Sequence, residues 1–198
     1  MLIIFNIIGL LIFLFLFWKR LKEDYLPNQI FSTFFYILFF ILLTYFISIS
    51  FFPSWWFWST YLGFLLGLVI SIFRFKLKFY ETYEAAFLGF LICFSLYLLG
   101  DSVKNLNAVS FFGFTVSMLL IGFFQFVDIN YKNFSWYKSG RVGFTGLVIS
   151  LLFFLVRLLT FLFFPNTLSL VYGFEIYIDS ISSFIFLALT YNLSRRNL

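Results

Sequence analysis

Three ionisable side chains near the end of the chain lie within or beside apolar runs, where charged residues are rare. Arg157 lies about seven residues, or roughly 10 Å, before the end of the apolar run 144–164. An arginine at that depth costs about 2.5–3.5 kcal/mol on membrane-insertion scales, so it is expected to face other helices and find a partner. Glu175 and Asp179 follow in the next apolar segment, four residues apart and therefore on one helical face. The pattern predicts that Arg157 pairs with Glu175 or Asp179.

Two interpretations of these three residues are open at this point. If the last helix starts near Leu168, Glu175 lies at nearly the depth of Arg157. The residues would then line a polar cavity that opens toward the outer leaflet and binds a lipid headgroup or another polar substrate. Alternatively, the ion pair only fixes the register of two helices, or the helix starts near Gly173 and Glu175 lies at the membrane surface.

The composition indicates that lipid surrounds most of the chain. Of the 198 residues, 63% are hydrophobic and only 11% are charged, against roughly 25% charged residues in soluble domains. The net charge of +5 would suggest nucleic acid for a soluble protein, but here the cations lie in short loops, where they report membrane topology. With no histidine and one cysteine, Cys93, no zinc, haem or iron–sulfur site and no cofactor are expected.

The apolar runs predict an all-α, polytopic membrane bundle of seven helices that forms one integral membrane domain over residues 1–198. Each run is long enough to cross a bilayer, and the prolines Pro27, Pro53 and Pro165 fall between runs. The polar stretch Gly100–Asn107 is expected to be an external turn. The predicted spans are approximately 1–18, 30–52, 57–73, 83–99, 108–127, 144–164 and 170–191.

Lysine and arginine residues predict the orientation of the bundle. Eleven of the 13 fall in segments assigned to one side of the membrane, Lys104 alone falls on the other side, and Arg157 is within a span. Basic loops mark the cytoplasmic side, so the N-terminus is expected outside and the C-terminus in the cytoplasm, in the cell (cytoplasmic or inner) membrane. The basic residues assigned to the inside are Lys19, Arg20, Lys22, Arg74, Lys76, Lys78, Lys132, Lys138, Arg141, Arg195 and Arg196.

The third span is expected to be the central packing element of the bundle. Gly63, Gly67 and Ser71 recur every fourth residue and share one face. Small residues at this spacing let a neighbouring helix backbone approach closely. Tryptophans at 55, 56 and 58 precede this stripe, and they favour the boundary between lipid tails and headgroups.

The order of these features resembles the bacterial prolipoprotein diacylglyceryl transferases. The matching segments are the basic loop FWKRLKEDYLPNQIF, the glycine-bearing span STYLGFLLGLVISIFRFKLK, and YKSGRVGFTGL followed by Arg157. The resemblance implies a seven-span protein that moves diacylglycerol from phosphatidylglycerol to a lipoprotein cysteine. It therefore implies that a membrane phospholipid, phosphatidylglycerol in particular, is the partner.

The chain departs from this family at two motifs. The family histidine would fall near Tyr61 and Leu62, where there is none, and CFSLYLLGDSVKN stands where a glycine-arginine-x-glycine-asparagine motif is expected. The missing histidine is the proposed general base of the family, and a general base typically contributes about 10²–10⁴-fold to a rate. Ordinary transferase activity is therefore not expected, and no catalytic residue is assigned. A diverged lipid-binding relative is the favoured interpretation. A small transporter or channel component and a non-catalytic membrane scaffold are the alternatives, although transporter sites usually form at interrupted helices.

Overall fold

The computed structural model describes residues 2–131, 142–163, 171 and 173–195. Within this part of the chain every regular element is a helix, and seven α-helices are each long and apolar enough to cross a membrane. The predicted seven-helix membrane architecture is therefore confirmed. The helices are α1 (Leu2–Leu21), α2 (Pro27–Phe51), α3 (Trp56–Phe75), α4 (Phe79–Asn105), α5 (Ala108–Asn130), α6 (Phe144–Phe163) and α7 (Glu175–Arg195), with a 3₁₀ turn η1 (Pro53–Trp55) before α3.

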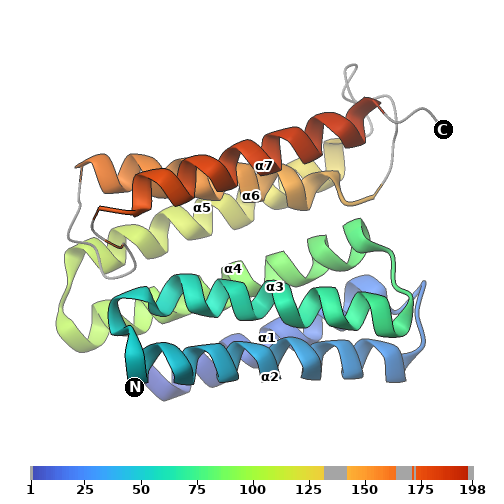
Figure 1. Ribbon diagram of the computed structural model, residues 1–198, viewed down its shortest axis with the longest axis horizontal. Coiled ribbons are helices and arrows are strands. Elements are labelled where there is room, and N and C mark those ends of the chain that lie inside the picture. Colours follow the sequence, from blue (N-terminus) through green and yellow to red (C-terminus); the bar gives the residue numbers. More distant parts are fainter. Residues whose placement is uncertain (1, 132–141, 164–170, 172, 196–198) are drawn as a thin grey trace.

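The helices lie side by side in two groups (Figure 1). One group holds α1–α4, in which α2 packs against α3 and α1 against α4. The other holds α5–α7, in which α6 packs against α7, and α4 joins the groups through α5 and α6. Because seven helices alternate in direction, α1 begins at one end of the bundle and α7 finishes at the other.

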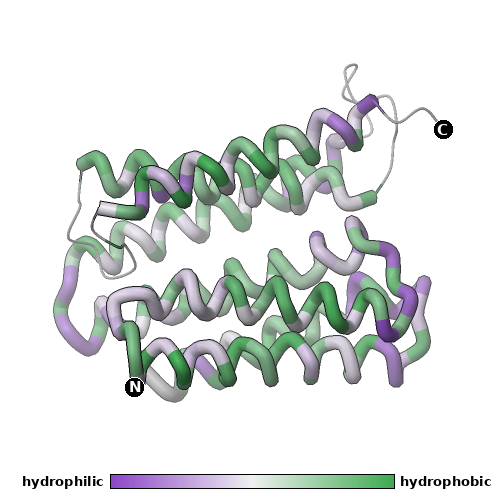
Figure 2. The backbone as a smooth tube through the Cα atoms, viewed as in Figure 1, coloured by the Kyte–Doolittle hydropathy of each residue, from purple (hydrophilic) through white to green (hydrophobic). Residues whose placement is uncertain are grey.

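The two ends of the bundle differ in charge. Seven basic residues lie at the end where α1, α3 and α7 finish, which we call the basic end; they are Lys19, Arg20, Lys22, Arg74, Lys76, Lys78 and Arg195. The opposite end carries the α4–α5 turn and Lys104. Figure 2 shows hydrophilic residues gathered at the loops and apolar residues along the helices. The placement of the basic end in the cytoplasm remains a prediction from the positive-inside rule.

The outward surfaces of the helices are apolar, as lipid contact requires. Phe46 in α2 is 75% exposed and Phe73 in α3 is 82% exposed. Leu119 in α5 and Phe184 in α7 are likewise exposed. In water such a surface would be costly, whereas in a bilayer it faces acyl chains of the same polarity.

The central helix is α4, and the prediction that the third span holds this place is wrong. Helix α4 contacts α1, α3, α5 and α6, and its residues from 82 to 92 are all buried. Ala85, Ala86 and Gly89 give it a narrow profile that lets several helices approach. Helix α3 uses its small residues against α2 and exposes Leu62 on another side.

The glycine stripe of α3 forms a close contact with α2. A Cβ atom added at Gly67 would lie 2.7 Å from the Ile37 Cα, and one at Gly63 would lie 2.5 Å from the Phe40 carbonyl oxygen. Both distances are shorter than van der Waals contact, so only glycine fits at this separation of the two helices. Ser71 is fully buried and donates to the Leu68 carbonyl oxygen at 2.9 Å.

The predicted external turn over Gly100–Asn107 is mostly helix. Helix α4 continues to Asn105, and Leu106 follows in the left-handed conformation at φ 50°. Asp101 explains the extension, because its buried carboxylate accepts hydrogen bonds from Asn105 at 2.7 Å and Ser110 at 2.5 Å. A polar side chain that finds its partners locally does not need to end the helix.

Two predicted helix starts also move. Helix α2 begins at Pro27 rather than 30, because proline is tolerated in the first helical turn, where its missing N–H has no partner to lose. Helix α7 begins at Glu175 rather than near 170. Gly173 adopts φ +85° just before it, and the Phe174 N–H donates to the Val171 carbonyl oxygen at 3.3 Å, which closes a turn ahead of the helix.

Candidate functional site

Arg157 lies inside the bundle on α6, toward the end opposite the basic end. It is 5% exposed, and its guanidinium carbon lies 3.6 Å from the centroid of the Phe57 ring. One terminal nitrogen pairs with Glu175 Oε1, and Nε lies 3.5 Å from Asp179 Oδ1. The three residues that the sequence singles out therefore meet in one group, which we call the Arg157 cluster.

Glu175 has donors for both of its oxygen atoms. Oε1 accepts from Arg157, while Oε2 accepts from the Trp58 indole N–H at 3.0 Å and from the Val171 backbone N–H at 2.9 Å. The residue is fully buried, so the alternative of a merely interfacial Glu175 does not hold. Trp58 also links α3 to α7. The position of Trp58 after the Pro53 turn suggested a membrane-boundary role, and no pattern in the sequence indicated this inward hydrogen bond.

Asp179 differs from Glu175 in its surroundings. It is fully buried, yet neither carboxylate oxygen has a hydrogen-bond partner among the described residues. Its ion pair is the 3.5 Å approach of Arg157 Nε. A carboxylate offers about four acceptor positions, so Asp179 retains most of its hydrogen-bonding capacity. One turn further along α7, Ser183 is buried and donates to the Asp179 backbone carbonyl rather than to this carboxylate.

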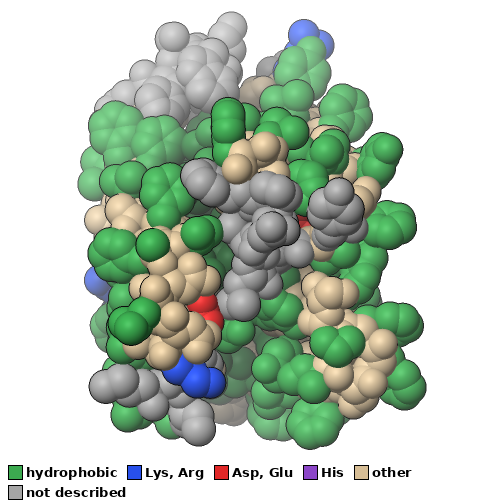
Figure 3. Space-filling model, turned by 90° about the vertical axis from the view of Figure 1, so that its left-hand side faces the viewer, with side chains coloured by type: hydrophobic (Ala, Val, Ile, Leu, Met, Phe, Trp, Pro, Cys, Tyr) green, Lys and Arg blue, Asp and Glu red, His purple; other side chains and the backbone are tan. Residues whose placement is uncertain are grey.

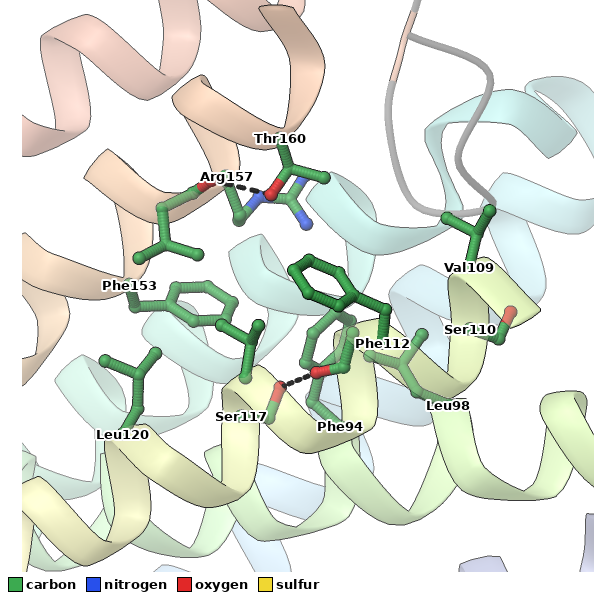
Figure 4. Close-up of a pocket in the computed structure, with 13 residues that line it drawn as sticks. Phe94, Leu98, Val109, Ser110, Phe112, Ser117, Leu120, Phe153, Arg157 and Thr160 are labelled. Atoms are coloured by element: carbon green, nitrogen blue, oxygen red, sulfur yellow. Dashed lines mark hydrogen bonds between the residues drawn. The ribbon is translucent and has the colours of Figure 1, made fainter. Parts of the chain in front are cut away.

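A cavity of about 70 Å³ adjoins Arg157 between α4, α5 and α6. Figure 4 shows Arg157 and Thr160 of α6 on one side and Ser110 and Ser117 of α5 on the other. The three hydroxyls donate elsewhere, to Val156, Asp101 and Gly113 respectively. Arg157 is thus the cationic side chain of this cavity. At about 10–15 Å³ for each water-sized group, a volume of about 70 Å³ holds roughly five to seven such groups, which is room enough for a phosphate.

A larger apolar cavity lies on the far side of Phe57. It measures about 240 Å³ between α1, α2, α3 and α4, and Phe57 and Phe94 form part of its wall. Phe94 also lines the smaller cavity beside Arg157. Tyr45 and Tyr97 add phenol rings to the larger cavity. A buried cation and an apolar cavity are thus separated by single aromatic side chains.

A groove of about 360 Å³ runs between α3 and α7. Trp58, Tyr61, Ile178 and Ser182 are among its lining residues. The Tyr61 hydroxyl is buried and has no hydrogen-bond partner among the described residues. Tyr83 is also buried, and its hydroxyl forms a hydrogen bond with the Ser150 hydroxyl at 2.7 Å. This groove brings the lipid-facing surface to within one helical turn of Asp179.

A second group of charged side chains lies at the basic end, and the sequence analysis did not predict it. Arg20 of α1 pairs with Glu84 of α4 at 2.5 Å and with Asp128 of α5. Glu84 is 2% exposed, and its other oxygen accepts from the Gly146 N–H of α6 at 3.0 Å. These contacts join four helices. The available signal was an acidic residue inside the predicted fourth span, since such residues are rare and need partners.

The loops at the basic end are tied together by Tyr25. Its hydroxyl donates to Glu81 at 3.2 Å and accepts from the Lys78 N–H at 3.0 Å. Burial raises the pKa of Tyr25, so the phenol remains protonated and able to donate. The hydrogen bond to Glu81 raises the pKa of the Lys78 ammonium. These contacts are structural and lie far from the Arg157 cluster.

The surface at the opposite end carries few charges. Figure 3 shows this end of the bundle, where hydrophobic and uncharged atoms predominate over the small lysine, arginine and acidic patches of the described residues.

No family model, no curated protein and no solved structure matches this chain. What the structure defines is the class: a multi-pass membrane protein whose described residues form a bundle of seven membrane-spanning helices and contain two groups of ion-paired side chains. The function has to be argued from those groups.

Proposed function

We propose that this protein binds a membrane phospholipid through the Arg157 cluster, in the outer leaflet of a bacterial cytoplasmic membrane. The observation that carries the proposal is the position of Arg157, a buried arginine that adjoins a cavity of phosphate size. Guanidinium groups bind phosphate through several N–H donors at once. The Phe57 ring beneath the guanidinium stabilises the cation by a cation–π contact.

Features around the cluster suit an amphiphilic ligand. The phosphate would lie beside Arg157, and the rest of that cavity is lined mainly by apolar side chains, Leu98, Val109 and Leu120 among them, which suits the adjoining acyl chains. Trp58 holds Glu175 and so fixes the carboxylate that orients Arg157. Charged residues inside a membrane are costly, and they are usually kept where they serve ligands or pathways.

Lipid binding without transfer is the form of this function that we favour. The resemblance to the diacylglyceryl transferases supports a phospholipid as the ligand. However, the chain has no histidine, and Tyr61 stands near the expected position of the family base with a hydroxyl that contacts no described acceptor. A protein of this kind would hold or present a lipid rather than transform it.

The test is the amount of phospholipid that remains bound after purification in detergent. Arg157→Met combined with Asp179→Asn keeps the formal charge of the cluster, since Glu175 remains with its bonds to Trp58 and Val171. We expect at least a tenfold loss of bound phospholipid at an unchanged helix content. Arg74→Met is the matched control, because Arg74 is an exposed cation at the basic end. Equal phospholipid in all three proteins would leave only the scaffold interpretation.

A further inference from the structure

The charges of the Arg157 cluster do not balance. One arginine meets two carboxylates, so the fully ionised group carries a formal charge of −1. No second lysine or arginine of the described residues forms an ion pair with Glu175 or Asp179. An uncompensated charge in a buried site is strongly unfavourable. A ligand that places a cationic group beside the second carboxylate would therefore offset the excess negative charge locally, and a ligand that brings only a negative charge would increase it.

The unequal hydrogen bonding of the two carboxylates shows where that positive charge belongs. Glu175 accepts three hydrogen bonds, from Arg157, Trp58 and Val171. Asp179 accepts none among the described residues, although it is fully buried. Leaving a buried acceptor without donors is unfavourable, and more so when the acceptor is charged. Asp179 is therefore the residue that gains most from a donor with positive charge.

We propose that the ligand is a phospholipid with a primary amine in its headgroup, of the phosphatidylethanolamine type. This inference rests on the proposed function and specifies its substrate class. The phosphate would lie beside Arg157, and the ammonium, with three N–H donors, would bind Asp179. The two protein groups are close enough to be shared by one headgroup, since Arg157 Nε and Asp179 Oδ1 are 3.5 Å apart.

The same chemistry disfavours two common headgroups. Phosphatidylglycerol carries a phosphate charge and hydroxyl groups, so it would add a negative charge to a cluster that already has one in excess. Phosphatidylcholine has the same charges as phosphatidylethanolamine, but its quaternary nitrogen has no N–H to donate to Asp179. A preference for phosphatidylethanolamine over phosphatidylcholine would therefore show that the headgroup nitrogen is recognised by its N–H donors and not only by its positive charge.

The experiment compares these three phospholipids, with identical acyl chains, by native mass spectrometry of the purified protein in detergent. We expect phosphatidylethanolamine to bind about tenfold more tightly than either of the others. That ratio corresponds to about 1.4 kcal/mol, which is close to the lower end of the net contribution of a hydrogen bond to a charged group. Asp179→Asn should abolish the preference and strengthen phosphatidylglycerol binding, because the cluster becomes neutral. Asp101→Asn is the matched control, since both Asp101 oxygens already accept hydrogen bonds.

The outcomes separate this inference from the proposed function. Equal binding of all three lipids, or a preference unchanged by Asp179→Asn, would overturn the inference and leave phospholipid binding in place. If Asp179→Asn only raises the melting temperature, Asp179 carries a proton in the native protein and the inference is wrong. Absence of binding by every lipid in the unaltered protein would refute the proposed function itself. Asp179→Glu, which retains the charge, should preserve the selectivity if Asp179→Asn fails to fold.

Discussion

Replacement of Gly67 by alanine should separate α2 from α3 and destabilise the bundle. The new Cβ would lie 2.7 Å from the Ile37 Cα and 2.8 Å from the Tyr36 carbonyl oxygen. Both are backbone atoms, so no side-chain rotation can relieve the contact, and one helix must shift. Overpacking of this kind typically costs about 1–3 kcal/mol. Alanine also favours the helix over glycine by about 1 kcal/mol, which partly offsets the loss.

Gly122→Ala serves as the control that removes the helix-propensity contribution from the comparison, because it makes the same glycine-to-alanine change. Gly122 lies within α5, and an added Cβ there meets no atom within 4 Å. The two variants make the same chemical change, so their difference in unfolding free energy isolates the packing cost, expected at about 1–3 kcal/mol. Unfolding in mixed detergent, followed by far-UV circular dichroism, measures it. Equal stability of the two variants would show that Gly67 does not lie at a close helix contact.

Further predictions concern groups elsewhere in the bundle. Tyr61→Phe should leave the unfolding free energy unchanged or raise it by up to about 1 kcal/mol, because the buried hydroxyl has no described hydrogen-bond partner; a clear loss in a melting curve would contradict this. Arg20→Met should cost about 3–5 kcal/mol by leaving Glu84 buried without its cation. Adding Glu84→Gln should recover part of that loss, and an absence of recovery would argue against the ion pair. Cysteine labelling should find position 104 accessible from outside and position 22 only from inside, and the reverse would refute the orientation.

The class of fold was predictable because its signals are local. Seven apolar runs separated by polar loops report helices that lipid surrounds, and each run appears in the structure as a helix. The residues at which the helices begin and end were less predictable, because helix ends depend on the hydrogen-bond partners of nearby side chains. Asp101 extends α4 through bonds to Asn105 and Ser110, and no periodicity in the sequence reports such bonds.

The candidate site was predictable in part for a related reason. An arginine inside an apolar run requires a partner, and two carboxylates one turn apart were the available ones. The structure brings all three together. The roles of Phe57 and Trp58 depend on how α3 packs beside α6 and α7, which is a tertiary property. The central place of α4 escaped prediction because the glycine stripe of α3 indicated one close neighbour, not the number of neighbours.

The binding of a phospholipid by Arg157 is the central claim, and lipid mass analysis of the purified protein tests it most directly. The unaltered protein should retain phospholipid after purification, at close to one molecule per chain if the site is single. Arg157→Lys keeps the charge but not the planar donor set, so it should retain an intermediate amount, while the charge-matched double variant, Arg157→Met with Asp179→Asn, should retain almost none. Identical phospholipid content in the unaltered protein and the double variant, with both folded, would contradict the claim.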